Sequence, residues 1–391
     1  MQLKLLSTSL SNNPSLSNSL FIIFWIVLWL LIIEVVLYAV PYNPPTKRPN
    51  SVQRYLEYGR SVEGKIRRMI GPTDETTAPV TIVGWLDAEM HERGHNIPTH
   101  PKTPDGLLVA IYGASHAQHL SRALAKEPNV TVRFWGGPGV PPSHSYKAYQ
   151  LDRGRHTAEV VIFALGAGSL IDMTTFTGLN RQFEWPLPYT FPKYHKVGDR
   201  LEEVWPSVRT MADFRQVLDD DKLWNNYVKE MQAEDSYYHP FTFHENFMDK
   251  LVIFRFIRRS WAKRHANRVK DSVYETSQGF GSNQIFSQGF KENSEVVQTL
   301  RLMLKEFARQ VRSDGKLPIV VLLNIRGYSN HLTQILAEHL QEANIPFVDS
   351  HIIAPSDDPK NLAPDNLHFS KEIDQQLAQA ALKIAHEHNK Y

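Results

Sequence analysis

The sequence predicts an α/β protein with a parallel, doubly wound sheet and one membrane-spanning helix near its N-terminus. Two observations support this prediction. From residue 107 to the C-terminus, short apolar runs typical of buried strands alternate with helical segments, and this alternation builds parallel sheets covered by helices on both faces. A separate apolar run, residues 20–40, precedes them and is interrupted only by Glu34.

The composition excludes several classes of protein. The chain has 391 residues, of which 42% are hydrophobic, and a net charge of +2. It is long enough for one large domain or two ordinary ones, and apolar enough to exclude a disordered chain. Its balanced charge argues against a nucleic-acid binder. The absence of cysteine excludes a disulfide scaffold, a cysteine nucleophile, thiolate zinc sites and iron–sulfur clusters, and suits an oxidising compartment.

Residues 1–19 are expected to be a polar tail and residues 20–40 a membrane anchor. As a helix the apolar run would reach about 31 Å, close to one hydrocarbon thickness. A cleaved signal peptide is the alternative, but its apolar region is shorter and ends in small residues, whereas here Leu37 precedes Ala39. We therefore expect an uncleaved anchor. Glu34, near its far end, is expected among the lipid headgroups or against a partner helix.

Residues 41–106 are expected to connect the anchor to the sheet. A stiff, proline-rich linker, residues 41–49, leads into an amphipathic helix over residues 52–70. Lys47, Arg48 and Arg54 follow the anchor, while only Lys4 and the amino terminus precede it. Taken alone, this count of positive charges favours a cytoplasmic C-terminal part.

The predicted α/β domain covers residues 107–391. Its expected strands are residues 107–113, 130–137, 159–166, 317–325 and 345–350, and its expected helices are residues 115–126, 294–311, 332–342 and 370–388. Residues 173–292 break this rhythm and are expected to form an insertion or lid at the functional edge of the sheet. The aromatic residues of 184–195 would either stack on sugar rings or pack the core of the insertion. The basic run 254–268 would be a solvated helix face or, alternatively, a phosphate site.

Three residues have the chemistry of a nucleophilic triad. Ser115 directly follows the first strand and opens a helix, where free N–H groups can hold an oxyanion; a plain N-cap serine is the alternative. Asp365 and His368 lie between the last strand and the last helix, three residues apart. A carboxylate at this spacing can orient the imidazole. Both loops lie at carboxyl ends of strands, where doubly wound sheets bind ligands.

These motifs together resemble the SGNH (GDSL-type) hydrolase superfamily. The resemblance is carried by Gly113-Ala114-Ser115-His116 and by Asp365-x-x-His368, and it excludes the insertion. It implies a flavodoxin-like, three-layer domain in which Ser115 is the nucleophile, His368 the base and Asp365 the residue that orients it.

The resemblance also implies an oxyanion hole, and here the chain departs from the pattern of the superfamily. The glycine of the second block matches Gly139, with Gly137 as the alternative. Gly168 stands where the superfamily has an asparagine, and Ala114 replaces the aspartate of Gly-Asp-Ser.

The layout of one anchor and a divergent SGNH-type domain is similar to that of proteins that O-acylate cell-surface polymers, such as the alginate acetylation and teichoic-acid D-alanylation proteins. This similarity implies a serine esterase or O-acyltransferase acting on a cell-envelope glycan with an acyl donor, beside a multi-span membrane acyltransferase. It also implies a single-pass inner-membrane protein whose C-terminal domain is extracytoplasmic (periplasmic), against the positive-charge count. The alternative is a weak or inactive module that binds polysaccharide or scaffolds the acyltransferase.

Other motifs add less. Asn324 and Arg326 end the fourth strand and could bind a substrate carboxylate or hydroxyl, or hold the loop together. We expect no cofactor and no metal, since there is no phosphate-binding glycine loop or Rossmann fingerprint after Gly113. His239 and His244 do not have a standard metal-ligand spacing.

Overall fold

The computed structural model describes residues 14–39, 51–69, 97–275 and 289–388. A five-stranded parallel sheet forms its centre, in the order β2-β1-β3-β6-β7. The strands are β1 (Leu107–Gly113), β2 (Val130–Gly136), β3 (Val160–Gly166), β6 (Leu317–Leu323) and β7 (Phe347–Asp349). This confirms the predicted α/β class with a parallel sheet. The order, read as 2-1-3-4-5 within the sheet, is one of the two common doubly wound orders.

Helices cover both faces of the sheet because the strands are apolar on both faces. One face packs against α5 (Ser115–Leu124) and α15 (Lys371–His388). The other packs against α6 (Pro142–Asp152), α12 (Glu295–Ser313) and α13 (His331–Glu342). In α12 the buried residues recur at three- and four-residue spacing, which is the pattern that predicts this helix from sequence. The strand order reverses at β1, so the crevice beyond the ends of β1 and β3 is where such a sheet binds ligands.

The segment expected as an insertion lies between the 3₁₀ helix η2 (Ala167–Thr174) and α12. It contains α7 (Gly178–Arg181), the antiparallel pair β4 (Lys193–Val197) and β5 (Arg200–Val204), α8 (Met211–Asp219), α9 (Asp221–Glu234), α10 (Pro240–Phe243), the 3₁₀ helix η3 (Phe247–Lys250) and α11 (Val252–Val273). It has an aromatic core of its own. Of the aromatic stretch 184–195, Tyr189 and Phe191 are buried in this core, while Trp185 is half exposed.

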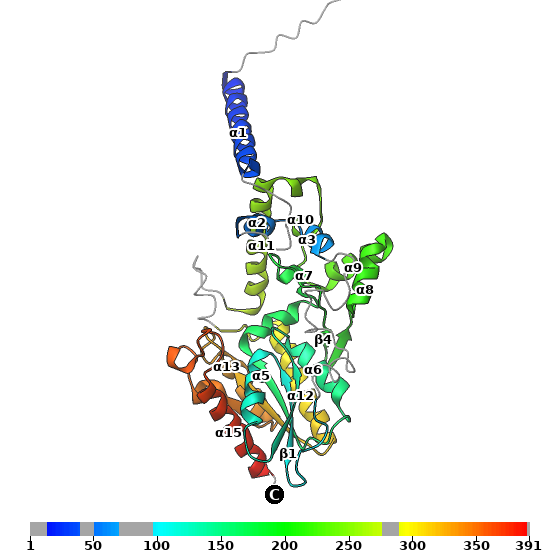
Figure 1. The fold of residues 1–391 in the computed structure, drawn as a ribbon, viewed down its shortest axis with the longest axis vertical. Coiled ribbons are helices and arrows are strands. Elements are labelled where there is room, and N and C mark those ends of the chain that lie inside the picture. The colour runs from blue at the N-terminus through cyan, green and yellow to red at the C-terminus, as the bar shows by residue number, and fades with distance from the viewer. Residues whose placement is uncertain (1–13, 40–50, 70–96, 276–288, 389–391) are drawn as a thin grey trace, which may run out of the picture.

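The long helix α1 (Pro14–Ala39) begins within the residues expected to be a polar tail. Within the described residues, one helix is long and apolar enough to cross a membrane, over Asn18–Leu37. Figure 1 shows α1 standing away from the body of the protein, with the insertion between α1 and the sheet. The linker at residues 41–49 lies outside the described residues.

The single helix expected over residues 52–70 is wrong, since two helices, α2 (Ser51–Glu57) and α3 (Val62–Met69), occupy this stretch. The helical stretch is interrupted between them by a turn that contains Gly59. A Cβ at Gly59 would lie 2.2 Å from the backbone oxygen of Arg255 in α11. Because α11 crosses so closely, only glycine fits at this point. The contacting residue, Arg255, is far away in the sequence, so the helix pattern of residues 52–70 could not reveal it.

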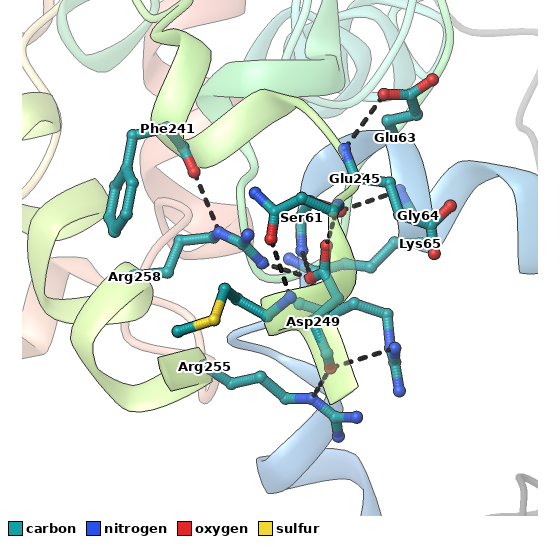
Figure 2. A network of polar contacts seen from close by, with 12 residues as sticks. Ser61, Glu63, Gly64, Lys65, Phe241, Glu245, Asp249, Arg255 and Arg258 are labelled. Carbon is teal, nitrogen blue, oxygen red and sulfur yellow. Dashed lines mark hydrogen bonds and ion pairs between the residues drawn. The ribbon is translucent and has the colours of Figure 1, made fainter. Parts of the chain in front are cut away.

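The basic run in α11 is only in part the solvated face that its composition suggested. Lys263, Arg264 and Arg268 are exposed, whereas Arg255 and Arg258 are buried. Arg258 pairs with Asp249, and Arg255 lies 3.1 Å from a carboxylate oxygen of Glu57 in α2. Figure 2 shows Asp249 at the centre of this network, which joins α3 to the insertion. Backbone N–H groups of Ser61 and Asn246 also donate to its carboxylate, at 2.8 and 3.0 Å. The first part of the run therefore holds α2 and the start of α3 against the insertion.

Candidate active site

Ser115 lies at the carboxyl end of β1 and is the first residue of α5. The N-cap of this helix is Ala114, and no side chain caps it. The hydroxyl of Ser115 instead lies 2.9 Å from Nε2 of His368. The alternative reading of Ser115 as a plain N-cap therefore does not describe the structure.

His368 and Asp365 form a closed turn before α15. Nδ1 of His368 lies 2.7 Å from Oδ2 of Asp365, whose other oxygen accepts from the backbone N–H groups of Leu367 and His368 at 2.9 and 3.0 Å. Asn366 takes a positive φ of 55° that makes this tight turn possible. The hydrogen bond to His368, followed by the two backbone bonds, holds the pKa of Asp365 well below its usual range. An ionised carboxylate only accepts hydrogen bonds, so Nδ1 carries the proton and Nε2 accepts from Ser115.

Two glycines let the strands and the helix meet closely at this point. A Cβ at Gly113 would lie 2.6 Å from the side chain of Ala117 and 2.6 Å from the backbone oxygen of Ala164. A Cβ at Gly136, at the end of β2, would lie 1.8 Å from the oxygen of Gly113. Only glycine permits these approaches, which set the position from which α5 presents Ser115. The three expected triad residues thus come together from loops that are far apart in the sequence.

Two further histidines flank the ring of His368, and the sequence analysis did not assign them a role. The ring of His119 stacks on it at 4.4 Å with an interplanar angle of 7°, and the ring of His116 lies at 4.5 Å and 38°. Burial, with His368 as the next cause, lowers the pKa of His116 to about 4 and lowers the pKa of His119. Both rings are therefore neutral at neutral pH. His119 lies four residues after Ser115, so helical spacing was the available signal.

The expected oxyanion residues lie at the same edge of the sheet. Gly139 is exposed in the loop after β2 and has a φ of 69°, whereas Gly137 is buried. The backbone N–H of Ser115 belongs to the first turn of α5, where such groups have no partner within the helix. Gly168 lies in η2, and a Cβ there would lie 3.0 Å from Cδ1 of Ile325 and 3.6 Å from the hydroxyl of Tyr328. Ile325 and Tyr328 therefore fill the space that an asparagine side chain would need.

Asn324 is fully buried and does not face a substrate. Its amide nitrogen donates to Thr333 and Asp349, both at 3.0 Å, and its amide oxygen accepts from the N–H of Leu332 at 3.0 Å. Through these bonds Asn324 connects the end of β6 to α13 and β7. Its expected role in substrate binding is therefore wrong, and the alternative, a structural role in the loop, is the one observed. Arg326, two residues later, is exposed at the active edge.

A pocket of about 570 Å³ lies beside His368, between α5 and the loop that leads into α15. His119 and Phe369 contribute to its wall, so it adjoins the stacked rings. Its lining also includes four basic residues, Arg122, Lys126, Lys360 and Lys371, and two acidic ones, Glu372 and Asp374. The basic residues outnumber the acidic ones, which would favour an anionic group of a ligand at this position.

The arrangement has the elements of acyl transfer: a nucleophile hydrogen-bonded to a base, a base oriented by a carboxylate, and helix N–H groups beside the nucleophile. Among the residues that the structure describes, no group of three or more His, Cys, Asp or Glu side chains is placed to hold a metal ion. Compared with models of known protein families, the chain matches none. A search of curated proteins likewise gives no match.

Proposed function

We propose that this chain is a serine-dependent acyl-transfer enzyme, an esterase or O-acyltransferase that acts on a cell-envelope polysaccharide. The observation that carries the proposal is the continuous hydrogen-bonded chain from Ser115 through His368 to Asp365. A lone serine at a helix start is common. A serine that instead bonds an oriented imidazole matches the geometry of an activated nucleophile.

The proposed reaction follows from this geometry. Oγ of Ser115 attacks the ester carbonyl while Nε2 of His368 takes the hydroxyl proton, and Asp365 stabilises the resulting imidazolium at Nδ1. The imidazolium then returns that proton to the departing alkoxide, which leaves an acyl group on Ser115. In the second step His368 removes a proton from water or from a sugar hydroxyl, and that oxygen attacks the carbonyl of the acyl group on Ser115. The bond between the acyl carbon and Oγ then breaks and the imidazolium returns the proton to Oγ, which gives hydrolysis with water and transfer with the sugar. Because His116 and His119 are neutral, they add no positive charge beside the imidazolium.

The location and the substrate class rest on α1 and on the resemblance to envelope-modifying proteins. We propose that α1 anchors the chain in the inner membrane as a single span, with the sheet domain on the periplasmic side. The carboxyl ends of the strands face the insertion and α1 (Figure 1). A polymer or acyl donor delivered by a multi-span acyltransferase in the same membrane would therefore approach the edge that carries Ser115.

A second candidate function has one observation in its favour. Ile325 and Tyr328 occupy the space beside Gly168, so no side-chain amide can donate to an oxyanion from that position. A domain without this donor could serve as a polysaccharide-binding module or as a scaffold for the acyltransferase. Reactivity of the serine separates the two candidates.

The deciding experiment is labelling of the full chain in membranes with a fluorophosphonate probe. We expect labelling of the unmodified chain, none of Ser115→Ala, and unchanged labelling of the control Ser169→Ala. Ser169 is a suitable control because its hydroxyl donates to the backbone oxygen of Gly166 at 2.7 Å at the same edge. Labelling that survives Ser115→Ala would remove the proposed nucleophile. A folded chain that is never labelled would favour the binding module.

The location is tested separately by fusing a reporter to the C-terminus. Activity of a reporter that works only in the periplasm would support the proposed orientation. Activity of a cytoplasmic reporter would show that Lys47, Arg48 and Arg54 decide the orientation, and the envelope-glycan substrate would then be wrong.

A further inference from the structure

Glu34 joins the apolar helix α1 to the insertion. Its two carboxylate oxygens accept hydrogen bonds from the backbone N–H groups of Val252 and Ile253, at 2.6 and 3.0 Å. These are the first residues of α11, whose N-terminal N–H groups have no partner within the helix. The carboxylate therefore caps α11 and also meets the positive end of its dipole. Glu34 is only 9% exposed as a result.

This contact fixes the height of the start of α11 relative to the apolar span. Glu34 lies inside the span Asn18–Leu37 and is not its last residue. The next two residues, Val35 and Val36, are 66% and 58% exposed. If α1 crosses a bilayer, leaving these side chains in water would cost free energy in proportion to their apolar area. The boundary of the hydrocarbon region then lies at or beyond Val36, so the start of α11 is level with the membrane surface.

The residues around the start of α11 have the chemistry of a membrane surface. We call η3 and the first residues of α11, residues 247–254, the insertion tip. Phe247 is 76% exposed and Leu251 is 37% exposed, and Lys250 between them is exposed. One turn further along α11, Ile257 is 54% exposed. Aromatic and aliphatic side chains next to a lysine are typical of segments that lie in the headgroup region.

Buried polar contacts of Asp249 hold the insertion tip in place, so the fold determines the exposure of Phe247. Asp249, two residues after Phe247, accepts from the N–H of Ser61 and pairs with Arg258 (Figure 2). Its backbone oxygen accepts from Nε of Arg255 at 2.6 Å. Turning Phe247 inward would break this buried network, and a buried charge left without its partner is strongly destabilising.

We infer that the insertion tip is a second membrane contact, in which Phe247 and Leu251 enter the lipid interface of the leaflet where α1 emerges. The inference rests on the proposed anchoring by α1. A lipid surface is the occupant that the contacts favour, because Glu34 already holds the tip at the end of an apolar span. The consequence is a fixed orientation: two contacts, one at α1 and one at the tip, stop the sheet domain from turning freely about a single anchor.

The absence of cysteine makes a direct test simple. Full-length single-cysteine variants are labelled with an environment-sensitive fluorophore and reconstituted, without other proteins, into phosphatidylcholine–phosphatidylglycerol vesicles. Phe247→Cys and Leu251→Cys report on the tip. Phe24→Cys, inside the span Asn18–Leu37, reports on the anchor. Ile352→Cys in α14 (Ser350–Ile353) of the sheet domain is the matched control, since Ile352 is 78% exposed and Phe247 76%.

We expect both tip labels to show a blue-shifted emission, quenching by shallow nitroxide lipids, and a several-fold lower quenching constant with aqueous iodide than the label at Ile352. If the tip labels behave like the label at Ile352 while the label at Phe24 is in lipid, the inference is wrong and the anchor stands; the tip would then be free to meet a protein partner. If the label at Phe24 is also open to iodide, the anchoring itself fails, and the inference fails with it.

Discussion

If Gly168 occupies the oxyanion position, a side-chain amide can be introduced there once the space that Ile325 fills is cleared. Gly168 is not among the described glycines with positive φ, so its backbone accepts a side chain. The obstacle is the Cδ1 atom of Ile325, 3.0 Å from the position of a new Cβ. Gly168→Asn alone therefore overpacks the site, a change that typically costs about 1–3 kcal/mol. Ile325→Val removes this methyl group at a typical cost of about 0.5–1.5 kcal/mol.

The double variant Gly168→Asn with Ile325→Val should therefore fold and carry the amide. Losing one such donor in a related site costs about 2.7–4 kcal/mol, or roughly 100- to 1000-fold in rate. We expect the unmodified chain to hydrolyse small esters slowly and the double variant to gain up to about that factor in kcat. The assay is hydrolysis of p-nitrophenyl acetate by the full chain, with each rate corrected by the same protein carrying Ser115→Ala. Ile325→Val alone is the matched control.

Two results would refute this reasoning. The first is a double variant that unfolds at the same temperature as Ile325→Val yet is no faster, because the donor is then not what limits the rate. The second is an unmodified chain that already cleaves small esters at ordinary rates, because the site must then supply the donor from another group. A gain seen only in the double variant, and lost with Ser115→Ala, would support both the alignment of Gly168 and the role of Ser115.

Three further predictions follow from other contacts. The Tyr328 hydroxyl lies 3.6 Å from the would-be Cβ of Gly168, and burial raises its pKa to about 12, so the phenol keeps its proton. If it donates to the oxyanion, Tyr328→Phe should lower kcat by up to about 100-fold with KM unchanged, whereas an unchanged kcat would exclude this role. The folded-state pKa of His116, about 4 against 6.5 in the unfolded chain, should leave stability intact above pH 6.5 and reduce it by about 3 kcal/mol (2.5 units at about 1.36 kcal/mol each) as pH falls towards 4. Burial lowers the pKa of His156 to about 4 as well and should add a similar loss, so in urea unfolding at pH 5 and 7 His116→Gln should remove about half of the combined loss. Asp249→Ala removes the carboxylate that pairs with the buried Arg258 and should lower the free energy of unfolding by about 3–5 kcal/mol, seen as faster proteolysis of the insertion. The control Asp213→Ala, which breaks an exposed capping box, should lower it by about 1 kcal/mol. Equal losses of stability in the two variants would contradict the buried network.

The sheet, and the proximity of Ser115, His368 and Asp365, could be predicted from the sequence because both depend on local patterns. Each strand is a short apolar run next to a helix start, and the carboxyl ends of parallel strands meet at one edge whatever the details of packing. Ser115 and His368 were therefore predictable as neighbours although 253 residues separate them. The sheet order was available only as an implication of the resemblance, since apolar runs do not show which strand lies beside which.

The errors share one physical cause, which is partners that lie far away in sequence. Asn324 at a strand end has the appearance of a site residue, but its partners Thr333 and Asp349 bury it. Arg255 and Arg258 have the appearance of a solvated face until Glu57 and Asp249 are placed against them. For Glu34 a partner helix was one of two expectations, but nothing local identified that helix as the one that starts 218 residues later. No local pattern carries such information, because burying a charge depends on which partner the fold brings to it.

These distant contacts also connect the apolar helix α1 with the edge of the sheet that carries Ser115. The 22 residues of α11, about 33 Å of helix, begin at the carboxylate of Glu34. Directly after the helix, the hydroxyl of Tyr274 lies 3.3 Å from the hydroxyl of Tyr328, which lies beside Gly168. The groups that fill the oxyanion position are thus supported by a helix whose other end is set by α1. A detergent that disturbs α1 would also disturb the contact of Glu34 with α11 and could displace Ile325 and Tyr328. The Gly168 and Tyr328 variants should therefore be compared in a bilayer.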